Sequence, residues 1–132
     1  QALGGRVEKA KRGWTLGIQP YNFLSQFPWV NNHNESVRLI HSHQDQVTEL
    51  PANAELIAEN ARVPIAMFRI GDHIMSMQGH PEFSEEYAQD VASLRKDILG
   101  ESLFNEASLS LMNKNSDRLE VTEWWIDFFN KS

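Results

Sequence analysis

The chain has 132 residues, of which 41% are hydrophobic and 23% are charged, and its formal net charge at pH 7 is −6. This composition is that of a single globular domain or less, and the acidic balance gives no indication of binding to nucleic acid or to an anionic membrane. No apolar run is long enough to cross a bilayer. Because the chain contains no cysteine, it forms no disulfide bonds.

The amino-terminal quarter is predicted to alternate short strands with turns and a loop. We expect residues 1–3 to end a helix that a pair of glycines stops, and residues 6–10 to form a weak strand. A second strand is predicted over residues 15–19, where apolar and polar side chains alternate. Residues 20–34 contain two prolines and an asparagine-rich end, which indicates a loop. A short helix over residues 21–26 is the alternative within that loop.

Residues 36–42 have the alternation of a strand, which places His41 and His43 on one face. Two histidines at this spacing, together with Asp45 and His80, would suit a zinc ion. No further ligand-like residue stands at a set spacing, so we favour an alternative. In it, His43 orients a pocket, and His41 packs within the strand or faces solvent.

The next stretch is predicted to be a turn followed by three strands. Residues 45–51 indicate the turn, and residues 55–61 a strand. Residues 65–70 and 73–78 are apolar on both sides of Gly71-Asp72, which predicts a β-hairpin. This hairpin leads into a tight corner.

The carboxy-terminal part is predicted to be helical. Ser84 stands as an N-cap before two acidic residues, and the helix is expected to run to Leu99. Two more helices are predicted, over residues 102–112 and from residue 116 or 117 to residue 130. The last one has more apolar surface than one stripe needs, so it either docks deeply or forms an interface. The apolar face predicted for the first helix consists of Tyr87, Val91, Leu94 and Ile98.

The corner between the hairpin and the first helix is Gln78-Gly79-His80-Pro81-Glu82-Phe83. Gly79 is expected to take backbone angles that a side chain would forbid, and Pro81 keeps His80 out of the helical region. His80 and Glu82 are two residues apart, near enough for the carboxylate to orient the imidazole. Such a pair is the base half of a nucleophilic triad. The alternative is a turn histidine beside a helix-start glutamate.

Three segments, in the same order along the chain, resemble the class I (triad) glutamine amidotransferases. Residues 78–83 resemble the His-Pro-Glu segment of that family, so His80 and Glu82 match the His and Glu of its Cys-His-Glu triad. Residues 42–47 resemble the Ser-His-x-Asp-x-Val segment beside the glutamine pocket. Gln1 matches the last residue of the nucleophile elbow, Gly-x-Cys-x-Gly-His-Gln.

The resemblance implies an α/β fold, namely part of a flavodoxin-like amidotransferase domain with a twisted mixed sheet, flanking helices and a helical carboxy terminus. Residues 1–100 would be the family-like part and residues 101–132 a helical extension of the same domain. The family's cysteine would fall a few residues before Gln1. We therefore expect this chain to be the carboxy-terminal part of a longer protein and to be inactive alone.

The activity implied by the resemblance is the release of ammonia from glutamine, without a cofactor or a metal. A γ-glutamyl peptide or amide hydrolase on the same scaffold and a non-catalytic binding domain are the alternatives. We expect a cytoplasmic protein that binds neither nucleic acid nor a membrane. Its partner would be a synthase, or a second copy bound through the carboxy-terminal helices. The implied catalytic residues are His80 and Glu82, and the implied substrate-binding residues are Gln1, Ser42, His43, Gln44 and Asp45.

Overall fold

A computed structural model of the chain describes residues 1–30 and 36–130. Strands come first and helices follow. The strands are β1 (Arg6–Lys9), β2 (Thr15–Phe23), β3 (Ser36–His43), β4 (Asp45–Glu49), β5 (Ala54–Glu59), β6 (Met67–Ile70) and β7 (Ile74–Met77). The helices are α1 (Glu85–Leu94), α2 (Lys96–Leu99), α3 (Glu101–Asn113) and α4 (Arg118–Asn130).

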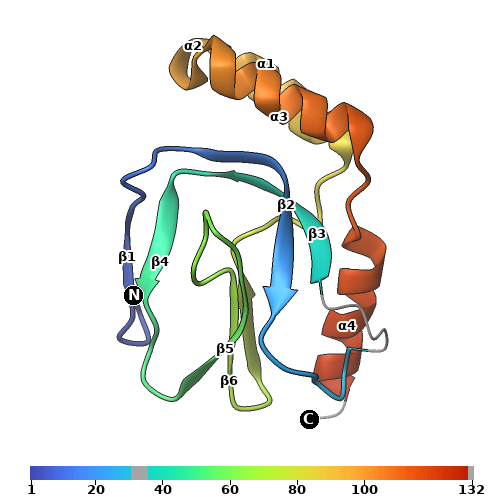
Figure 1. The fold of residues 1–132 in the computed structure, drawn as a ribbon. Helices are drawn as coiled ribbons and strands as arrows, with labels where there is room; N and C mark the ends of the chain where they lie inside the picture. Colours follow the sequence, from blue (N-terminus) through green and yellow to red (C-terminus); the bar gives the residue numbers. More distant parts are fainter. Residues whose placement is uncertain (31–35, 131–132) are drawn as a thin grey trace.

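The main sheet has the strand order β3-β2-β5-β6-β7, and β1 pairs with β4 in a separate ribbon (Figure 1). The predicted α/β class is confirmed. The expected mixed sheet differs in detail, because every strand pair within the described residues is antiparallel. Most of these pairs join strands that follow one another along the chain, and a short connection reverses the chain direction.

The predicted hairpin is present as β6 and β7. Its register pairs Ile70 with Ile74 across the turn, and Gly71 has a φ of 55°, a left-handed conformation that glycine adopts without strain. The hairpin therefore depends on a turn residue that is visible in the sequence.

Two predictions near the amino terminus were wrong. Residues 1–3 form a single turn instead of a helix end, closed by a 2.9 Å hydrogen bond from Gly4 N to Gln1 O. The predicted loop, with its alternative short helix, begins instead as the continuation of β2 to Phe23. Pro20 is tolerated there because the pairing of β2 with β5 begins only at Asn22. Residues 31–34 of that predicted loop lie outside the described residues.

The turn predicted over residues 45–51 is largely strand β4. Its register with β1 pairs Lys9 with Asp45 and Val7 with Val47. The partner strand lies almost forty residues earlier in the chain, so the local sequence gave no sign of this pairing.

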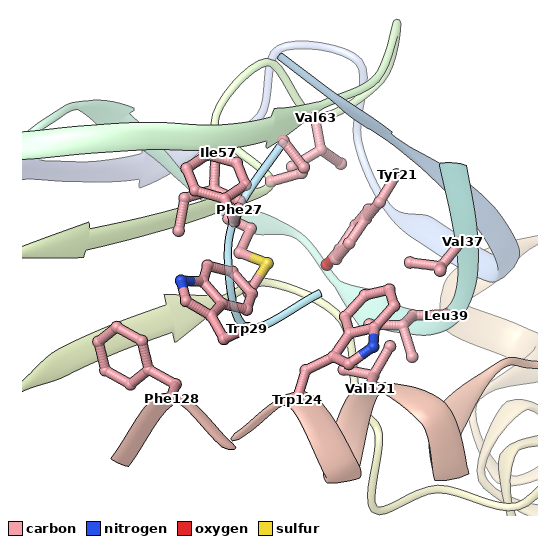
Figure 2. Close-up of a cluster of buried hydrophobic side chains, with 13 residues drawn as sticks. Tyr21, Phe27, Trp29, Val37, Leu39, Ile57, Val63, Val121, Trp124 and Phe128 are labelled. Carbon is pink, nitrogen blue, oxygen red and sulfur yellow. The ribbon is translucent and has the colours of Figure 1, made fainter. Parts of the chain in front are cut away.

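Helix α4 packs against one face of β2 and β3 through large side chains. Trp124 and Phe128 are 1% and 3% exposed and join a cluster that includes Tyr21 and Leu39 of the strands. Figure 2 shows Val121 and the two aromatic side chains pointing from the helix into this cluster. Of the two outcomes predicted for the apolar surplus, deep docking is the one observed, although some apolar residues remain exposed: Leu119, Ile126 and Phe129.

Helices α1 and α3 pack on the other face through small side chains together with Leu111. Ala88 and Ala92 of α1 and Ala107 of α3 are buried against β2 and β3 residues such as Ile18. Ser84 caps α1 as predicted, and its hydroxyl accepts a hydrogen bond from Tyr87 N. The predicted apolar face was wrong, because three of its members are exposed, at 52%, 88% and 73%: Tyr87, Leu94 and Ile98. The expected long helix also divides at its C-cap, Arg95.

The outer edge of β3 is occupied by two other segments. Asp117, just before α4, accepts a hydrogen bond from Arg38 N (2.7 Å) through its carboxylate and donates its own N–H to Arg38 O (2.8 Å). Two residues along, His80 N donates to Ile40 O (2.8 Å). The chain that leaves β7 therefore returns to the opposite edge of the sheet.

Among the described residues, no helix combines the length and the apolar character that crossing a bilayer requires.

Candidate active site

Successive backbone N–H groups hold the corner that follows β7. Gln78 N donates to Ala66 O (2.9 Å), Gly79 N to the Tyr21 hydroxyl (2.5 Å) and His80 N to Ile40 O (2.8 Å). The acceptors belong to the segment before β6, to β2 and to β3. The position of His80 is therefore fixed from three directions.

A glycine is required at position 79 because neighbouring atoms leave no room for a side chain, and not because of its backbone angles. It is not among the residues with positive φ, which corrects the reason expected from the sequence. A Cβ at this position would lie 2.7 Å from the Tyr21 hydroxyl oxygen, 3.0 Å from Leu39 Cβ and 3.2 Å from His41 Nε2. Any side chain here would displace the corner.

His80 is oriented by Glu82 and by an aromatic neighbour. The His80 Nδ1 lies 2.7 Å from Glu82 Oε1, and the imidazole stacks on the Phe83 ring with a centroid distance of 4.2 Å and an interplanar angle of 10°. An ionised carboxylate only accepts hydrogen bonds, so the proton is on Nδ1. The lone pair of the neutral ring is then on Nε2, which is the arrangement of a general base.

A second histidine pair lies beside this corner, at the end of β3. His41 Nδ1 is 2.8 Å from His43 Nε2, and His43 Nδ1 is 2.9 Å from the Asp45 carbonyl oxygen. The carbonyl can only accept, so His43 carries its proton on Nδ1 and accepts at Nε2. It follows that His41 also carries its proton on Nδ1 and donates it to His43.

Both members of this pair are neutral at pH 7. Burial, and next the repulsion that His43 and His80 would exert in their protonated forms, lowers the pKa of His41 to about 3. Burial also lowers the pKa of His43, and the hydrogen bond to Asp45 only partly offsets it. The two facing nitrogens bind one another instead of a common ion. Within residues 1–30 and 36–130, no cluster of three or more potential metal-binding side chains is found.

The other predicted residues of this segment flank His43 along the chain. Ser42 and Gln44 are half-buried at the end of β3, and Gln44 O accepts a hydrogen bond from Ala10 N (2.8 Å). The Asp45 side chain is exposed. Both ring nitrogens of His43 are already engaged, so its imidazole is built into the fold.

Gln1 is connected to the corner through the β1–β4 ribbon. Its side-chain amide donates to Val7 O (3.1 Å), and Val7 pairs with Val47. Val47 N in turn donates to Gln78 Oε1 (3.0 Å). The amino-terminal segment is thus linked to the corner by a relay through Val7, Val47 and Gln78.

Tyr21 is a site residue that the sequence did not reveal. Its ring is fully buried, and its hydroxyl accepts the Gly79 N–H. The neighbouring Pro20 indicated a loop, which hid the alternation of β2. The role of Gln78 as a side-chain acceptor was also missed, because only a contact with β4 gives it meaning.

The fold, the His-x-Glu corner and the Ser-His segment together define a family, and the comparisons with known proteins agree. Residues 1–98 match the family described as glutamine amidotransferase class-I. The chain therefore belongs to the class I glutamine amidotransferase family.

Among curated proteins, the chain is similar to two γ-glutamyl peptidases of Arabidopsis thaliana. Gamma-glutamyl peptidase 4 is 30% identical over 87% of this chain and 48% of its own length, and gamma-glutamyl peptidase 3 is 27% identical over 88% and 50%. A GMP synthase [glutamine-hydrolyzing] of Phocaeicola vulgatus is 33% identical over 74% of this chain and 19% of its own length. The chain spans about half the length of these peptidases.

Solved structures show the same fold. A glutamine amidotransferase of Thermotoga maritima superposes with a TM-score of 0.70 at 18% identity, over 96% of this chain and 56% of its own. A glutamine amidotransferase of Methylobacillus flagellatus superposes with a TM-score of 0.71 at 14% identity, over 98% and 55%.

Proposed function

We propose that this chain supplies the base half of a Cys-His-Glu triad that cleaves the γ-amide bond of a γ-glutamyl substrate. The 2.7 Å contact between His80 Nδ1 and Glu82 Oε1 carries the proposal, because it places the basic lone pair on Nε2. The nucleophile would be a cysteine in residues upstream of Gln1, since this chain has none.

The chemistry would take two half-reactions. The cysteine thiol gives its proton to His80 Nε2, and the thiolate attacks the γ-carbonyl carbon. As the C–S bond forms and the C–N bond breaks, His80 returns the proton to the leaving amine. Water then attacks the thioester with His80 as base, which releases glutamate and the thiol. Glu82 stabilises the charged imidazole in each step.

Residues at the end of β3 would bind the substrate's amino-acid head. We assign this role to the side chains or backbone of Ser42 and Gln44 and to the side chain of Gln1. The exposed Asp45 carboxylate would hold the α-ammonium group. His43 would shape the pocket and not contact substrate through its ring, because both its nitrogens are engaged.

Two substrates share the γ-glutamyl group. The similarity to γ-glutamyl peptidases over 87% and 88% of the chain favours a γ-glutamyl peptide. Glutamine, with ammonia passed to a synthase partner, is the second candidate, and the 33% identity to a GMP synthase supports it. A non-catalytic domain is the remaining alternative.

The test uses the full-length protein that contains this chain, with glutamine and a γ-glutamyl dipeptide as substrates. Release of ammonia or of the free amino acid is measured for the wild type, His80→Ala and Glu82→Gln. We expect His80→Ala to lower kcat about 10²-fold or more, the scale of general acid–base catalysis. Glu82→Gln should lower kcat by a smaller factor, because the substitution keeps the shape of the side chain and removes only its charge. His73→Ala, in the exposed turn between β6 and β7, is the control.

The 132-residue chain alone should release neither product, because no thiolate is present to form the acyl-enzyme. Turnover by this chain, or full activity of His80→Ala, would contradict the triad. A full-length protein inactive on both substrates would support the non-catalytic alternative.

A further inference from the structure

We propose that His41 is a positioning residue for His80, acting through its hydrogen bond to His43 and its place beside the corner at Gly79. This inference rests on the proposed function. It concerns a residue outside the three segments that match the family's motif residues, and the proposed reaction assigns His41 no step.

His41 stands between the corner and the end of β3. It is 0% exposed, and its ring meets the Tyr21 ring edge-on at a centroid distance of 5.3 Å and an angle of 84°. A Cβ on Gly79 would be 3.2 Å from His41 Nε2. His41 also directly follows Ile40, whose carbonyl accepts the His80 N–H. Movement of the His41 ring would therefore displace the backbone that carries His80.

The Nε2 atom of His41 has an unusual environment. It is buried without a hydrogen-bond partner in the described part of the chain. A buried acceptor without a partner destabilises a fold, whereas an apolar side chain of similar shape would fill the same space without that cost. A purely structural position would not favour histidine here. The presence of a histidine at position 41 is explained if the N–H at its Nδ1 has a function.

That donor fixes the His43 ring, and with it the turn into β4. His43 is held at both ends, by His41 Nδ1 at 2.8 Å and by the Asp45 carbonyl at 2.9 Å. The strand that follows donates Val47 N to Gln78 Oε1, on the corner itself. His41 thus lies beside the corner at Gly79 and is connected to it through β4.

Neutrality of the pair also matters for the proposed chemistry. His80 becomes positively charged whenever it holds the proton of the thiol. A charged neighbour would oppose that step by like-charge repulsion. Because burial keeps the pKa of His41 and that of His43 low, both remain neutral while His80 is protonated.

Two substitutions of His41 in the full-length protein separate its functions. His41→Leu removes both ring nitrogens, whereas His41→Asn keeps an N–H donor attached at Cγ, close to where Nδ1 stands. We expect His41→Leu to lower kcat about tenfold or more with KM changed less than about twofold, since small displacements of a catalytic group are costly. His41→Asn should recover most of kcat. The matched control is His73→Leu, which should leave kcat unchanged.

A second measurement does not depend on activity. In protein labelled with ¹⁵N-histidine, the ring shifts should show His41 neutral with its proton on Nδ1 from pH 5.5 to pH 8, and His43 neutral with its proton on Nδ1 at pH 7 to pH 8. An Nε2-protonated His41 would overturn the inference. So would a His41→Leu protein that melts at a lower temperature but retains the wild-type kcat, because that is the result of a purely structural role.

If His41→Leu does not fold, His43→Leu tests the same hydrogen bond at a half-buried position. A tenfold loss of kcat with KM changed less than about twofold supports the inference, whereas an unchanged kcat, or a loss confined to KM as expected of pocket damage alone, contradicts it. The inference and the proposed function fail differently. Full activity of His80→Ala removes the triad itself, whereas an inactive His80→Ala with a fully active His41→Leu removes only the positioning role.

Discussion

The α4 layer and the α1–α3 layer cover opposite faces of β2 and β3 with side chains of very different size. On the α4 face, Trp124 and Phe128 meet Tyr21 of the sheet in one large cluster. On the other face, Leu111 packs beside alanines such as Ala92 and Ala107, and the alanines let the helices approach the strands closely. The α4 layer buries aromatic side chains, whereas the α1–α3 layer brings its helices close to the strands.

Both layers reach the candidate site, through different contacts. Tyr21 belongs to the aromatic cluster, and its hydroxyl holds Gly79. Packing of α4 is therefore connected to the corner that carries His80. The α1–α3 layer reaches the corner through Phe83, which stacks on His80 and packs against a cluster that includes Ile40 and Ala88.

The largest effect is expected within α4, where two adjacent phenylalanines differ in burial. Phe128 is 3% exposed and packs edge-on against Trp29, and Phe129 is 47% exposed. Phe128→Ala should lower the free energy of unfolding by about 3–5 kcal/mol, the usual range for a buried phenylalanine. Phe129→Ala should lower it by less than about 1 kcal/mol. Urea unfolding of both variants measures the difference, and equal losses would mean that α4 does not dock as described.

Lowering the pH should lower the free energy of unfolding through His41. The pKa of His41 is lowered from 6.5 to about 3, so below pH 6.5 the unfolded chain binds a proton that the folded chain does not. The free energy of unfolding should therefore fall as pH falls, by about 1.4 kcal/mol per pH unit for this one group, down to pH about 3.

Urea unfolding between pH 4.5 and pH 8 measures this slope. His41→Leu should remove the contribution of this one group to the slope. A wild-type slope equal to that of His41→Leu would show that His41 is protonated in the folded chain.

Close approach on the other face can be tested at two glycines with similar backbone angles. Gly17 and Gly13 have φ values of 75° and 81°. A Cβ on Gly17 would lie 3.1 Å from Ala107 Cα and would overlap Ser110 Oγ, whereas a Cβ on Gly13 meets no described atom within 4 Å.

Both alanine variants lose about 1–2 kcal/mol to the left-handed conformation. Gly17→Ala should lose about 1–3 kcal/mol more because it overfills the α3–β2 contact. Thermal or urea unfolding of the pair isolates that second contribution. Similar losses would indicate that α3 can move away from β2 at little cost.

The smallest effect is expected on the outer surface of α1. Leu94 is 88% exposed although the sequence pattern placed it on the buried face. Leu94→Gln should change the free energy of unfolding by less than about 0.5 kcal/mol. Ala92→Gln, at a fully buried position on the same helix, is the contrasting variant and should be clearly destabilising. A large loss for Leu94→Gln would mean that the face identified from the sequence is buried after all.

These contrasts also show what a single sequence can predict. The helix start at Ser84 and the hairpin at Gly71 were predictable because each depends on one local residue with a specific conformational role. The buried face of α1 was not, because the periodicity of large apolar residues points to Leu94 while the packing uses alanine. Strand β4 was not predictable either, since it exists through pairing with the distant β1.

The candidate site divides in the same way. The contact of His80 with Glu82 follows from their two-residue spacing, and the roles assigned to them stay predictions. Tyr21 and the proton on His41 Nδ1 depend on which residues meet across β2, β3 and the corner. Such contacts depend on strand register and on burial, and neither can be predicted from a sequence motif.

The hydrogen bonds on the outside of β3 have a consequence for how the molecule behaves in a crowded solution. The edge of a sheet is a template on which a strand of another molecule can add, and repeated addition leads to aggregates. In β3, the Arg38 N–H and C=O are taken by Asp117, and the Ile40 C=O is taken by His80. Loosening of the corner would therefore do more than displace an imidazole, because it would also open a docking edge for intermolecular growth.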